Sequence, residues 1–476
     1  MDLRPYQVEA VDGARAHLRR GAKRVLIVCP TGGGKTVIAS DIIHRAESKG
    51  SRVLFLAHRR ELIQQTADKL RRFDVRHGII MAGERPALQH AVQVASIQTL
   101  ARRRDALTAV DLIFFDEAHH AAAGTYTDVL KWYPQARVVG LTATPWRLDG
   151  RGLADVFDAH VLVRTPKQLR DEGFLVPVGG WEYEAIDTSH ARVQRGDFAQ
   201  ADLAAEALKP RVVGDVVEEW LRHAGGKRTV VFAVSIEASQ MMAAKFREAG
   251  VAAEHVDGEM ASAERDAVLR RLRSGQTLVV CNCNVLTEGF DCPELEVCVL
   301  ARPTLSVSLY LQMVGRVLRP APGKATARIH DHAGCLASHG HPYAHRDYSP
   351  EATVKGERNP KQDADTRARN VCPSCKSVRD GYPCANCGYT PTPEELRIEF
   401  EEAAYARAIT EAESPEALKT KKLAREFRAR SEEEKREFFS RMVAKYGPRK
   451  AIGVYRWWSG ETAWPPREWR AAAEAA

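Results

Sequence analysis

A glycine-rich segment near the start of the chain constrains the fold more than any other feature of the sequence. It reads Gly32, Gly33, Gly34, Lys35, Thr36, and it lies between an apolar, strand-like run and a helical pattern. Glycines let backbone N–H groups approach phosphate oxygens closely because they carry no side chain. We expect the lysine to pair with the β- and γ-phosphates of ATP and the threonine hydroxyl to bind Mg²⁺. The predicted local structure is a phosphate-binding loop on an α/β sheet.

The residues just before these glycines bear on the same prediction. We expect Thr31 to line the phosphate site, whereas Cys29 stands where the general phosphate-loop pattern has its first glycine. The N-terminus of the following helix adds partial positive charge that favours an anion. A glycine-rich turn that arose by chance is the alternative, but it leaves the preceding strand and the following helix unexplained.

Apolar runs alternate with helical patterns in two separate parts of the chain. The runs are almost continuously apolar, which predicts strands buried on both faces, as in a parallel sheet. The expected strands are 24–29, 52–57, 92–95, 111–115, 137–141, 229–234, 278–281 and 297–300, and the expected helices are 36–48, 60–72, 236–249, 261–273 and 306–314. The sequence therefore predicts two α/β units, the first of which holds the phosphate loop.

An acidic pair directly follows one of these apolar runs. Asp116 and Glu117 come immediately after the expected strand 111–115. The carboxyl ends of parallel strands form the edge of the sheet at which ligands bind. We therefore expect Asp116 to hold Mg²⁺ together with Thr36, and Glu117 to act as the base that orients the attacking water.

Several segments occur in an order that resembles the superfamily 2 helicases with a DEAH box. Asp116 and Glu117 begin that box, and Ala118 and His119 complete it. The other matching segments are 3–7, 57–62, 96–100, 141–145, 230–235, 284–291 and 312–319. The resemblance covers roughly residues 1–335. It implies two tandem RecA-like domains with parallel sheets and an ATP site between them.

The resemblance also implies roles for individual residues. Arg4 and Gln7 are expected to contact the adenine nucleotide, and Gly289 and Asp291 are expected to reach it from the second domain. The residues expected to grip a nucleic-acid strand are Arg59, Gln98, Thr99, Thr287 and Thr304. These contacts address the backbone of the strand, so binding should weaken as salt rises.

The segment 312–319 carries two arginines that are three residues apart. Arg316 and Arg319 share a helix face if the helix expected at 306–314 continues through them. Arginines supplied by a second domain stabilise charge on a γ-phosphate, as an arginine finger does. The alternative, that they are surface or nucleic-acid contacts, applies more to Arg319. We expect Gln312 to touch the γ-phosphate or its water.

A narrower resemblance is to bacterial RadD-type repair helicases and to similar phage-encoded helicases. It rests on the stretch 302–324 and on a cysteine cluster further on. The chain departs from that pattern in Ala118, in having fewer C-terminal cysteines and in a shorter C-terminal region. The resemblance implies an ATP-dependent helicase or translocase that acts in DNA repair or recombination. The implied partners are single-stranded or branched DNA and a single-strand-binding protein or recombinase.

The cysteine cluster has the spacing of a zinc site. Cys372 and Cys375 form one C-x₂-C pair, and after eight residues Cys384 and Cys387 form a second. Four thiolates so spaced can surround one Zn²⁺ tetrahedrally, with sulfur at about 2.3 Å. We expect a structural zinc ribbon, rather than a redox or disulfide role.

Length and composition set the domain plan. The 476 residues allow about three domains, and a net charge of +8 permits nucleic-acid binding. The expected organisation is 1–165 and 225–350 for the RecA-like domains, 166–224 for a connector, 371–389 for the zinc ribbon and 390–476 for a mainly helical region with a tryptophan-rich basic tail. The absence of a long apolar run and of an N-terminal apolar core predicts no membrane contact and a cytoplasmic protein.

Three questions stay open at this point. Trp457, Trp458, Trp464 and Trp469 lie among arginines, and they either stack on bases or dock the tail onto the protein. The histidines of 330–345 do not form the pattern of a second metal or nuclease site. The motor interpretation competes with a DNA-stimulated ATPase that remodels or anneals DNA without unwinding. It also competes with a nucleotide-switched, zinc-containing DNA-binding scaffold, and with an RNA helicase.

Overall fold

The computed structural model describes most of the chain. The described residues are 3–103, 107, 109–120, 124–183, 185–194, 196–354, 371–375, 377–378, 383–392, 430–446, 451, 455, 465–466 and 469. They form two compact units, 1–389 and 390–476. Among the helices so described, none combines the length and the apolar character needed to span a bilayer.

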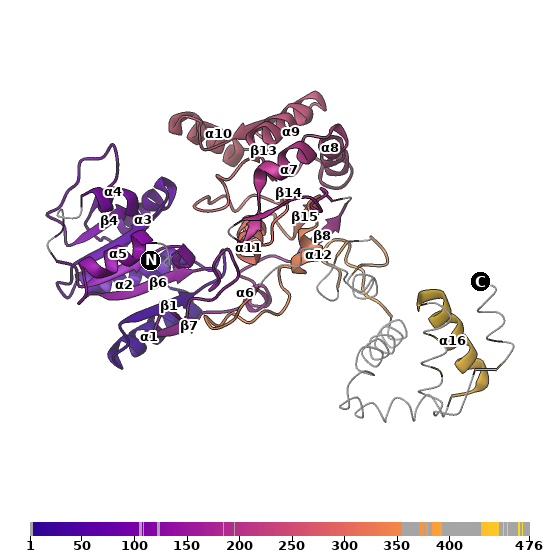
Figure 1. Ribbon diagram of the computed structural model, residues 1–476, viewed down its shortest axis with the longest axis horizontal. Coiled ribbons are helices and arrows are strands. Elements are labelled where there is room, and N and C mark those ends of the chain that lie inside the picture. The colour runs from indigo at the N-terminus through magenta and orange to yellow at the C-terminus, as the bar shows by residue number, and fades with distance from the viewer. Residues whose placement is uncertain are drawn as a thin grey trace. The chain divides into compact units, whose positions relative to one another are not determined.

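The first lobe is built on a sheet of seven strands in the order β3-β4-β2-β5-β6-β1-β7 (Figure 1). Every neighbouring pair in it is parallel. Its elements are α1 (Pro5–Arg19), β1 (Arg24–Val28), α2 (Lys35–Glu47), β2 (Val53–Ala57), α3 (Arg60–Arg72), β3 (His77–Ile80), β4 (Val92–Ser96), α4 (Ile97–Arg102), β5 (Leu112–Phe115), the 3₁₀ turn η2 (Ala118–His120), α5 (Gly124–Trp132), β6 (Arg137–Thr142) and β7 (Ala159–Leu162).

The second lobe is built on a sheet of six strands in the order β12-β13-β11-β14-β15-β8, again with parallel pairs throughout. Its elements are β8 (Val178–Glu182), α8 (Pro210–Ala224), β11 (Thr229–Ala233), α9 (Ile236–Glu248), β12 (Ala253–Val256), α10 (Ser262–Ser274), β13 (Val279–Asn282), β14 (Val297–Ala301), α11 (Val307–Val314), β15 (Ala327–Asp331) and α12 (Cys335–His339). The prediction of two α/β units with parallel sheets is confirmed.

Several short elements occupy the stretch that the sequence predicted as a connector. They are α6 (Pro166–Asp171), β9 (Val193–Gln194), β10 (Asp197–Phe198) and α7 (Gln200–Ala207), in addition to β8 and α8. The strand β8 pairs with β15 along the edge of the second sheet. This stretch therefore contributes an edge strand to the second lobe.

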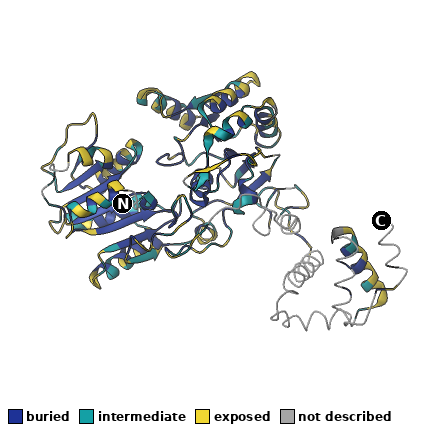
Figure 2. Ribbon diagram, in the orientation of Figure 1, coloured by how far each residue is buried: buried dark blue, intermediate teal, exposed yellow. Residues whose placement is uncertain are grey.

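Burial explains which strands the sequence could predict. All five residues of β2 and of β11 are buried, so their apolar character is continuous. Figure 2 shows the strands inside both lobes mostly in the dark blue of buried residues. At the edges of the first sheet, β3 alternates between buried and half-buried residues, and β7 has no buried residue. Edge strands of this kind carry a weak apolar signal, and these two were not predicted.

The second unit contains one described helix, α16 (Glu432–Tyr446). Its Phe439 lies 5.9 Å from the ring of Tyr455 and 6.1 Å from the ring of Trp469. Trp469 therefore packs against other residues of this unit. This agrees with the alternative in which the tail docks onto the protein rather than stacking on bases. The other three tryptophans of the tail and their neighbouring arginines lie outside the described residues.

Two buried histidines, His330 in β15 and His332 just after it, predict acid sensitivity of the second lobe. Burial lowers the pKa of both His330 and His332 to about 3, from an ordinary value of 6.5. The unfolded chain takes up protons below about pH 6.5 while the fold keeps both rings neutral. Stability is therefore full above pH 6.5 and falls by about 1.4 kcal/mol per pH unit per histidine toward pH 3.

Urea unfolding between pH 7.5 and pH 5 measures this loss. The variant His332→Phe keeps a ring against Tyr183, whose ring lies 4.4 Å away, and removes one titrating group. We expect it to lose less stability over that interval than the wild type. The same change at the exposed His345 should leave the slope unaltered. Equal slopes in all three proteins would contradict the assignment.

Candidate active site between the two lobes

The phosphate loop has the backbone that its glycines permit. It connects β1 to α2, and Gly32 and Gly34 have φ values of 90° and 87°, which side-chain-bearing residues rarely adopt. A Cβ at Gly33 would lie 2.6 Å from the sulfur of Cys29. The loop therefore wraps around the Cys29 side chain, which explains how a cysteine is accommodated where the general pattern has glycine.

The carboxyl edge of the first sheet gathers the segments singled out from the sequence. Along the order β4-β2-β5-β6-β1, each strand is followed by one of them. These are 96–100, 57–62, 116–119, 141–145 and the phosphate loop, respectively. Because the strands are parallel, all five segments lie at one edge.

The acidic pair lies beside the phosphate-loop lysine. The Nζ of Lys35 is 2.9 Å from Oε1 of Glu117, and both side chains are largely buried. Burial alone would raise the pKa of Glu117, but the Lys35 ammonium holds it below the ordinary value. Burial and the adjacent Glu117 charge raise the pKa of Asp116 to about 7. A divalent cation at Asp116 would favour its ionised form.

The N-terminal segment packs directly on the phosphate loop. Tyr6 and Gln7 both donate to the carbonyl of Gly33, at 3.0 and 3.1 Å. The guanidinium of Arg4 lies 4.6 Å from the ring centre of Phe174, which also contacts the Tyr6 ring at 5.0 Å. Phe174 was missed by the sequence analysis because a single aromatic residue outside any motif gives no signal.

The helix α11 of the second lobe contacts the first lobe. Ser308 accepts a 2.9 Å hydrogen bond from the hydroxyl of Thr144. One turn later, Gln312 is buried, and its Nε2 has no hydrogen-bond partner among the described residues. A Cβ at Gly315 would lie 2.6 Å from the Cβ of Thr31 in the phosphate loop. The C-terminal end of α11 therefore abuts the nucleotide-binding loop.

The helix ends at Val314, as the sequence predicted, and residues 315–317 form a turn. The condition under which the two arginines would share a helical face, a helix that continues through them, is therefore not met. Both guanidiniums nevertheless converge on the carbonyl of Phe290, which accepts from Arg316 at 2.7 Å and from Arg319 at 3.4 Å.

Arg319 approaches the phosphate loop. A Cβ at Gly32 would lie 3.3 Å from Cγ of Arg319, and Arg319 also forms an ion pair with Asp291. Burial and the neighbouring Arg319 charge lower the pKa of Arg316 to about 10, while the charge of Glu117 opposes that change. Arg316 therefore stays protonated at neutral pH.

The residues expected to contact a nucleic-acid strand differ in how far they are buried. Gln98 is exposed and Thr99 is half-buried, whereas Thr287 and Thr304 are buried. The hydroxyl of Thr304 donates to Asp197 at 2.8 Å. The structure does not gather these residues into one exposed surface.

Two of the remaining predicted residues lie on opposite sides of the contact between the lobes. Arg59 donates from the first lobe to the carbonyls of Asn284 and Val285, at 3.0 and 3.2 Å. A Cβ at Gly289 would lie 3.3 Å from Cβ of Glu61 in α3. The loop 284–291 of the second lobe thus rests on the first lobe beside the predicted strand-binding segment 57–62.

A cluster of histidines around Glu288 also joins the lobes. Its carboxylate lies 2.7 Å from Nε2 of His58, and 3.5 Å from Nε2 of both His119 and His120. Nε of Arg59 is 3.2 Å away. Sequence reasoning missed this cluster, although the consecutive histidines after the acidic pair and the glutamate of the segment 284–291 were visible.

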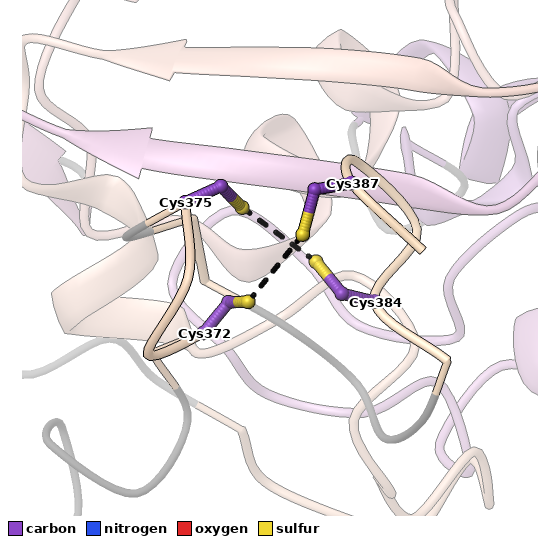
Figure 3. Close-up of side chains that lie close together, drawn as sticks. All are labelled: Cys372, Cys375, Cys384 and Cys387. Carbon is purple, nitrogen blue, oxygen red and sulfur yellow. Dashed lines mark hydrogen bonds between the residues drawn. The ribbon is translucent and has the colours of Figure 1, made fainter. Parts of the chain in front are cut away.

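The four cysteines of the zinc prediction point toward one another (Figure 3). The sulfurs of Cys372 and Cys387 are 3.7 Å apart, as are those of Cys375 and Cys384. Tetrahedral Zn²⁺ with sulfur at about 2.3 Å requires sulfurs about 3.8 Å apart. The four thiols therefore fit one zinc ion.

The cysteine cluster also contacts the edge of the second sheet. The carbonyl of Val378 accepts from the amide of Gly180 in β8 at 3.3 Å. A Cβ at Gly179 would lie 3.2 Å from Cβ of Asn386. Covering this edge protects the unpaired backbone groups of β8.

Two family models match the chain, one in each lobe. The model described as type III restriction enzyme, res subunit, matches residues 1–147, and the helicase conserved C-terminal domain matches residues 211–321. A 51.5 kDa protein of a Lactococcus phage (isolate 7-9) is 35% identical over 389 residues, which are 79% of this chain and 81% of that protein. The chain belongs to helicase superfamily 2. Its two α/β lobes are those of an ATP-hydrolysing enzyme.

Other relatives of this superfamily 2 helicase are longer or less similar. A Saccharomyces cerevisiae protein provisionally named ATP-dependent helicase IRC3 is 33% identical over 355 residues, which are 70% of this chain and 51% of that protein. The chain thus matches about half the length of this yeast relative. The DNA 3'-5' translocase XPB2 of Sulfurisphaera tokodaii is 25% identical over 360 residues, 67% of this chain and 79% of that protein.

A solved structure is similar in fold to this superfamily 2 helicase. It is a fragment described as an HsdR subunit of a type I restriction enzyme from Vibrio vulnificus YJ016. The two share a TM-score of 0.57 at 25% identity, over 73% of this chain and 66% of that one.

Proposed function

We propose that this chain is an ATP-driven DNA translocase or helicase that works in DNA repair or recombination. The observation that carries the proposal is the approach of Gly315 and Arg319 of the second lobe to the phosphate loop of the first. An ATP site completed by both lobes couples hydrolysis to their relative movement. The domain limits expected from the sequence belong to this proposal, except that β8 and α8 of the stretch 166–224 are assigned to the second lobe.

The residues of the nucleotide site have separate roles in the proposal. Lys35 leaves Glu117 for the β- and γ-phosphates when ATP binds, since a phosphate is the stronger partner for the ammonium. Thr36 and Asp116 would hold Mg²⁺, which supplies charge neutralisation at the phosphates. Glu117, released from Lys35, orients and deprotonates the attacking water. Gln312 lies one turn from the Ser308–Thr144 contact and faces the γ-phosphate.

The other nucleotide contacts come from both lobes. Arg4, Gln7, Thr31 and the three glycines of the loop would bind ATP from the first lobe, and Gly289 and Asp291 from the second. The support is strongest for Gln7, whose amide already contacts the carbonyl of Gly33 at 3.1 Å. It is weaker for Gly289, which packs against α3 rather than against the phosphate loop.

DNA is the proposed track because a relative named a DNA 3'-5' translocase aligns with 67% of this chain and a restriction-enzyme family model matches the first lobe. Gln98 is the exposed member of the proposed grip, and Thr99 and Arg59 are half-buried. Arg59 is engaged by carbonyls of the second lobe, and the buried Thr304 by Asp197, so both would have to leave these partners to bind a strand. Thr287 is also buried. Single-stranded or branched DNA fits a grip on backbone alone. A single-strand-binding protein or a recombinase is the proposed class of protein partner.

Zinc is the proposed occupant of the four-cysteine site, and the site is expected to hold the edge of the second lobe in place. One zinc ion per chain is expected by elemental analysis. Replacing Cys384 with serine removes a ligand and frees β8, and we expect the melting temperature to fall by about 5 °C or more. Replacing the exposed Ser374 with alanine is the matched control, and it should change neither value. Full zinc content in the cysteine variant would contradict the assignment.

The proposal is tested by ATP hydrolysis in the presence of single-stranded DNA, duplex DNA, forked DNA, RNA or no polymer. We expect a DNA form to stimulate hydrolysis strongly and Lys35→Ala to abolish it. Stimulation by RNA alone would mean that the track is RNA rather than DNA. Hydrolysis that no polymer stimulates would favour the nucleotide-switched scaffold. Stimulation should decline as salt rises, since phosphate contacts release counterions.

A further inference from the structure

Glu288 is a buried carboxylate of the second lobe that inserts among side chains of the first. It lies in the loop between β13 and β14, and its side chain is only 6% exposed. A buried carboxylate is costly unless it is paired. Here Arg59 and three imidazoles surround it, which explains why its pKa lies well below the ordinary value despite burial.

One of these imidazoles connects Glu288 to the proposed base. His119 lies between two carboxylates, with Nδ1 at 3.4 Å from Oε2 of Glu117 and Nε2 at 3.5 Å from Oε1 of Glu288. Its Nδ1 is also 3.5 Å from the hydroxyl of Thr142. The two ring nitrogens therefore face the proposed base on one side and the second lobe on the other.

The position of the Glu117 carboxylate depends on few other contacts. Its Oε1 is held by Lys35, which the proposed function transfers to the phosphates of ATP. Its Oε2 is buried and has no hydrogen-bond partner among the described residues. Once Lys35 has moved, Nδ1–H of His119 can donate to this carboxylate while Nε2–H donates to Glu288, provided that the ring is an imidazolium. Burial lowers the pKa of His119, and the two flanking carboxylates oppose that change and favour the charged ring.

We propose that Glu288 is a positioning residue for ATP hydrolysis, acting through His119 on Glu117. This inference rests on the proposed function of Glu117 as the base. Glu288 accepts from Nε2 of His119 and so fixes the orientation of the imidazole beside Glu117. Because Glu288 belongs to the second lobe, His119 has this acceptor only while the lobes are in contact. Glu117 is thus held in its working orientation only while the lobes are in contact, which is also the state in which Arg316 contributes to the site.

A purely structural role for Glu288 makes a different prediction. If it only joined the lobes through His58 and Arg59, its loss would resemble the loss of any other ion pair between them. The chain offers such a pair, because Arg265 of α10 and Glu61 of α3 lie 2.7 Å apart. Arg265→Gln removes that contact without touching His119, and it is the matched control.

The test is a double-mutant cycle of Glu288→Gln and His119→Ala, measured as steady-state ATP hydrolysis with and without DNA. We expect each single variant to lower kcat by about 10- to 100-fold, as small misplacements of a reacting group do, with the KM for ATP changed less than about threefold. The double variant should be no slower than the slower single variant, because both changes remove the same link. Arg265→Gln should keep kcat within about twofold of the wild type.

Three results would overturn the proposal: multiplicative effects of the two variants, an equal loss in Arg265→Gln, or a changed KM with an unchanged kcat. Should Glu288→Gln fail to fold by thermal melting, His119→Gln alone still tests the link, and an unchanged kcat in it would overturn the proposal. A wild type that DNA does not stimulate would refute the proposed track, yet the cycle on the unstimulated rate still tests Glu288.

Discussion

Replacing Arg316 with lysine is expected to lower the rate of ATP hydrolysis by about 10³-fold or more. The guanidinium is buried and donates to the carbonyl of Phe290 at 2.7 Å. An arginine presents a planar fork that spans two oxygens, whereas a lysine is a single point charge with a shorter reach. The substitution keeps the charge, so the predicted loss reports geometry rather than net charge.

Single-turnover hydrolysis with saturating ATP measures this effect, because it separates chemistry from product release. Arg273→Lys is the matched control. Arg273 donates to the carbonyl of Asp291 in the same loop, but we expect it to have no contact with ATP. Its rate should stay within about twofold of the wild type. A rate in Arg316→Lys above about one tenth of the wild type would contradict the arginine-finger role.

Replacing Glu117 with glutamine is expected to give a protein that binds ATP but hydrolyses it about 10²- to 10⁴-fold more slowly. The amide cannot take a proton from water. It also removes the negative charge that holds Lys35 at 2.9 Å in the absence of nucleotide. With that competitor gone, Lys35 is free for the phosphates, so the affinity for ATP should stay equal or increase.

Equilibrium binding of ATP alongside single-turnover hydrolysis separates these two effects. Lys35→Ala is the contrasting variant, because it should lose binding and hydrolysis together. Full biological function in Glu117→Gln would favour the nucleotide-switched scaffold over the motor. Unchanged hydrolysis in that variant would remove Glu117 from the role of base.

The sequence predicted the inner parts of the fold better than its edges. The strands β1, β2, β5 and β11 are buried throughout or nearly so, and their apolar runs gave boundaries close to the observed ones. The strand β8 contains two adjacent glycines, and its place depends on pairing with β15 and on cover by the cysteine cluster. Such dependence on distant residues leaves no local pattern in the sequence.

The candidate site was likewise predicted where it depends on local sequence and missed where it depends on distant contacts. The phosphate loop and the pair Asp116–Glu117 follow strands directly, so local sequence was enough to bring them to one edge of the sheet. The helix of Gln312 was expected to end at residue 314 and does so, and the arginines converge on the carbonyl of Phe290 from the turn that follows, which local sequence did not predict. The contacts of Glu288 with three histidines join segments of different lobes, and only the folded chain shows them.

Displacement of streptavidin from biotinylated DNA tests the central claim most directly, because it reports movement along the track rather than hydrolysis. The account predicts displacement that requires ATP, from the DNA form that stimulates hydrolysis, and its loss in Glu117→Gln despite intact ATP binding. DNA-stimulated hydrolysis without any displacement would contradict the translocase and favour an ATPase that remodels or anneals DNA in place.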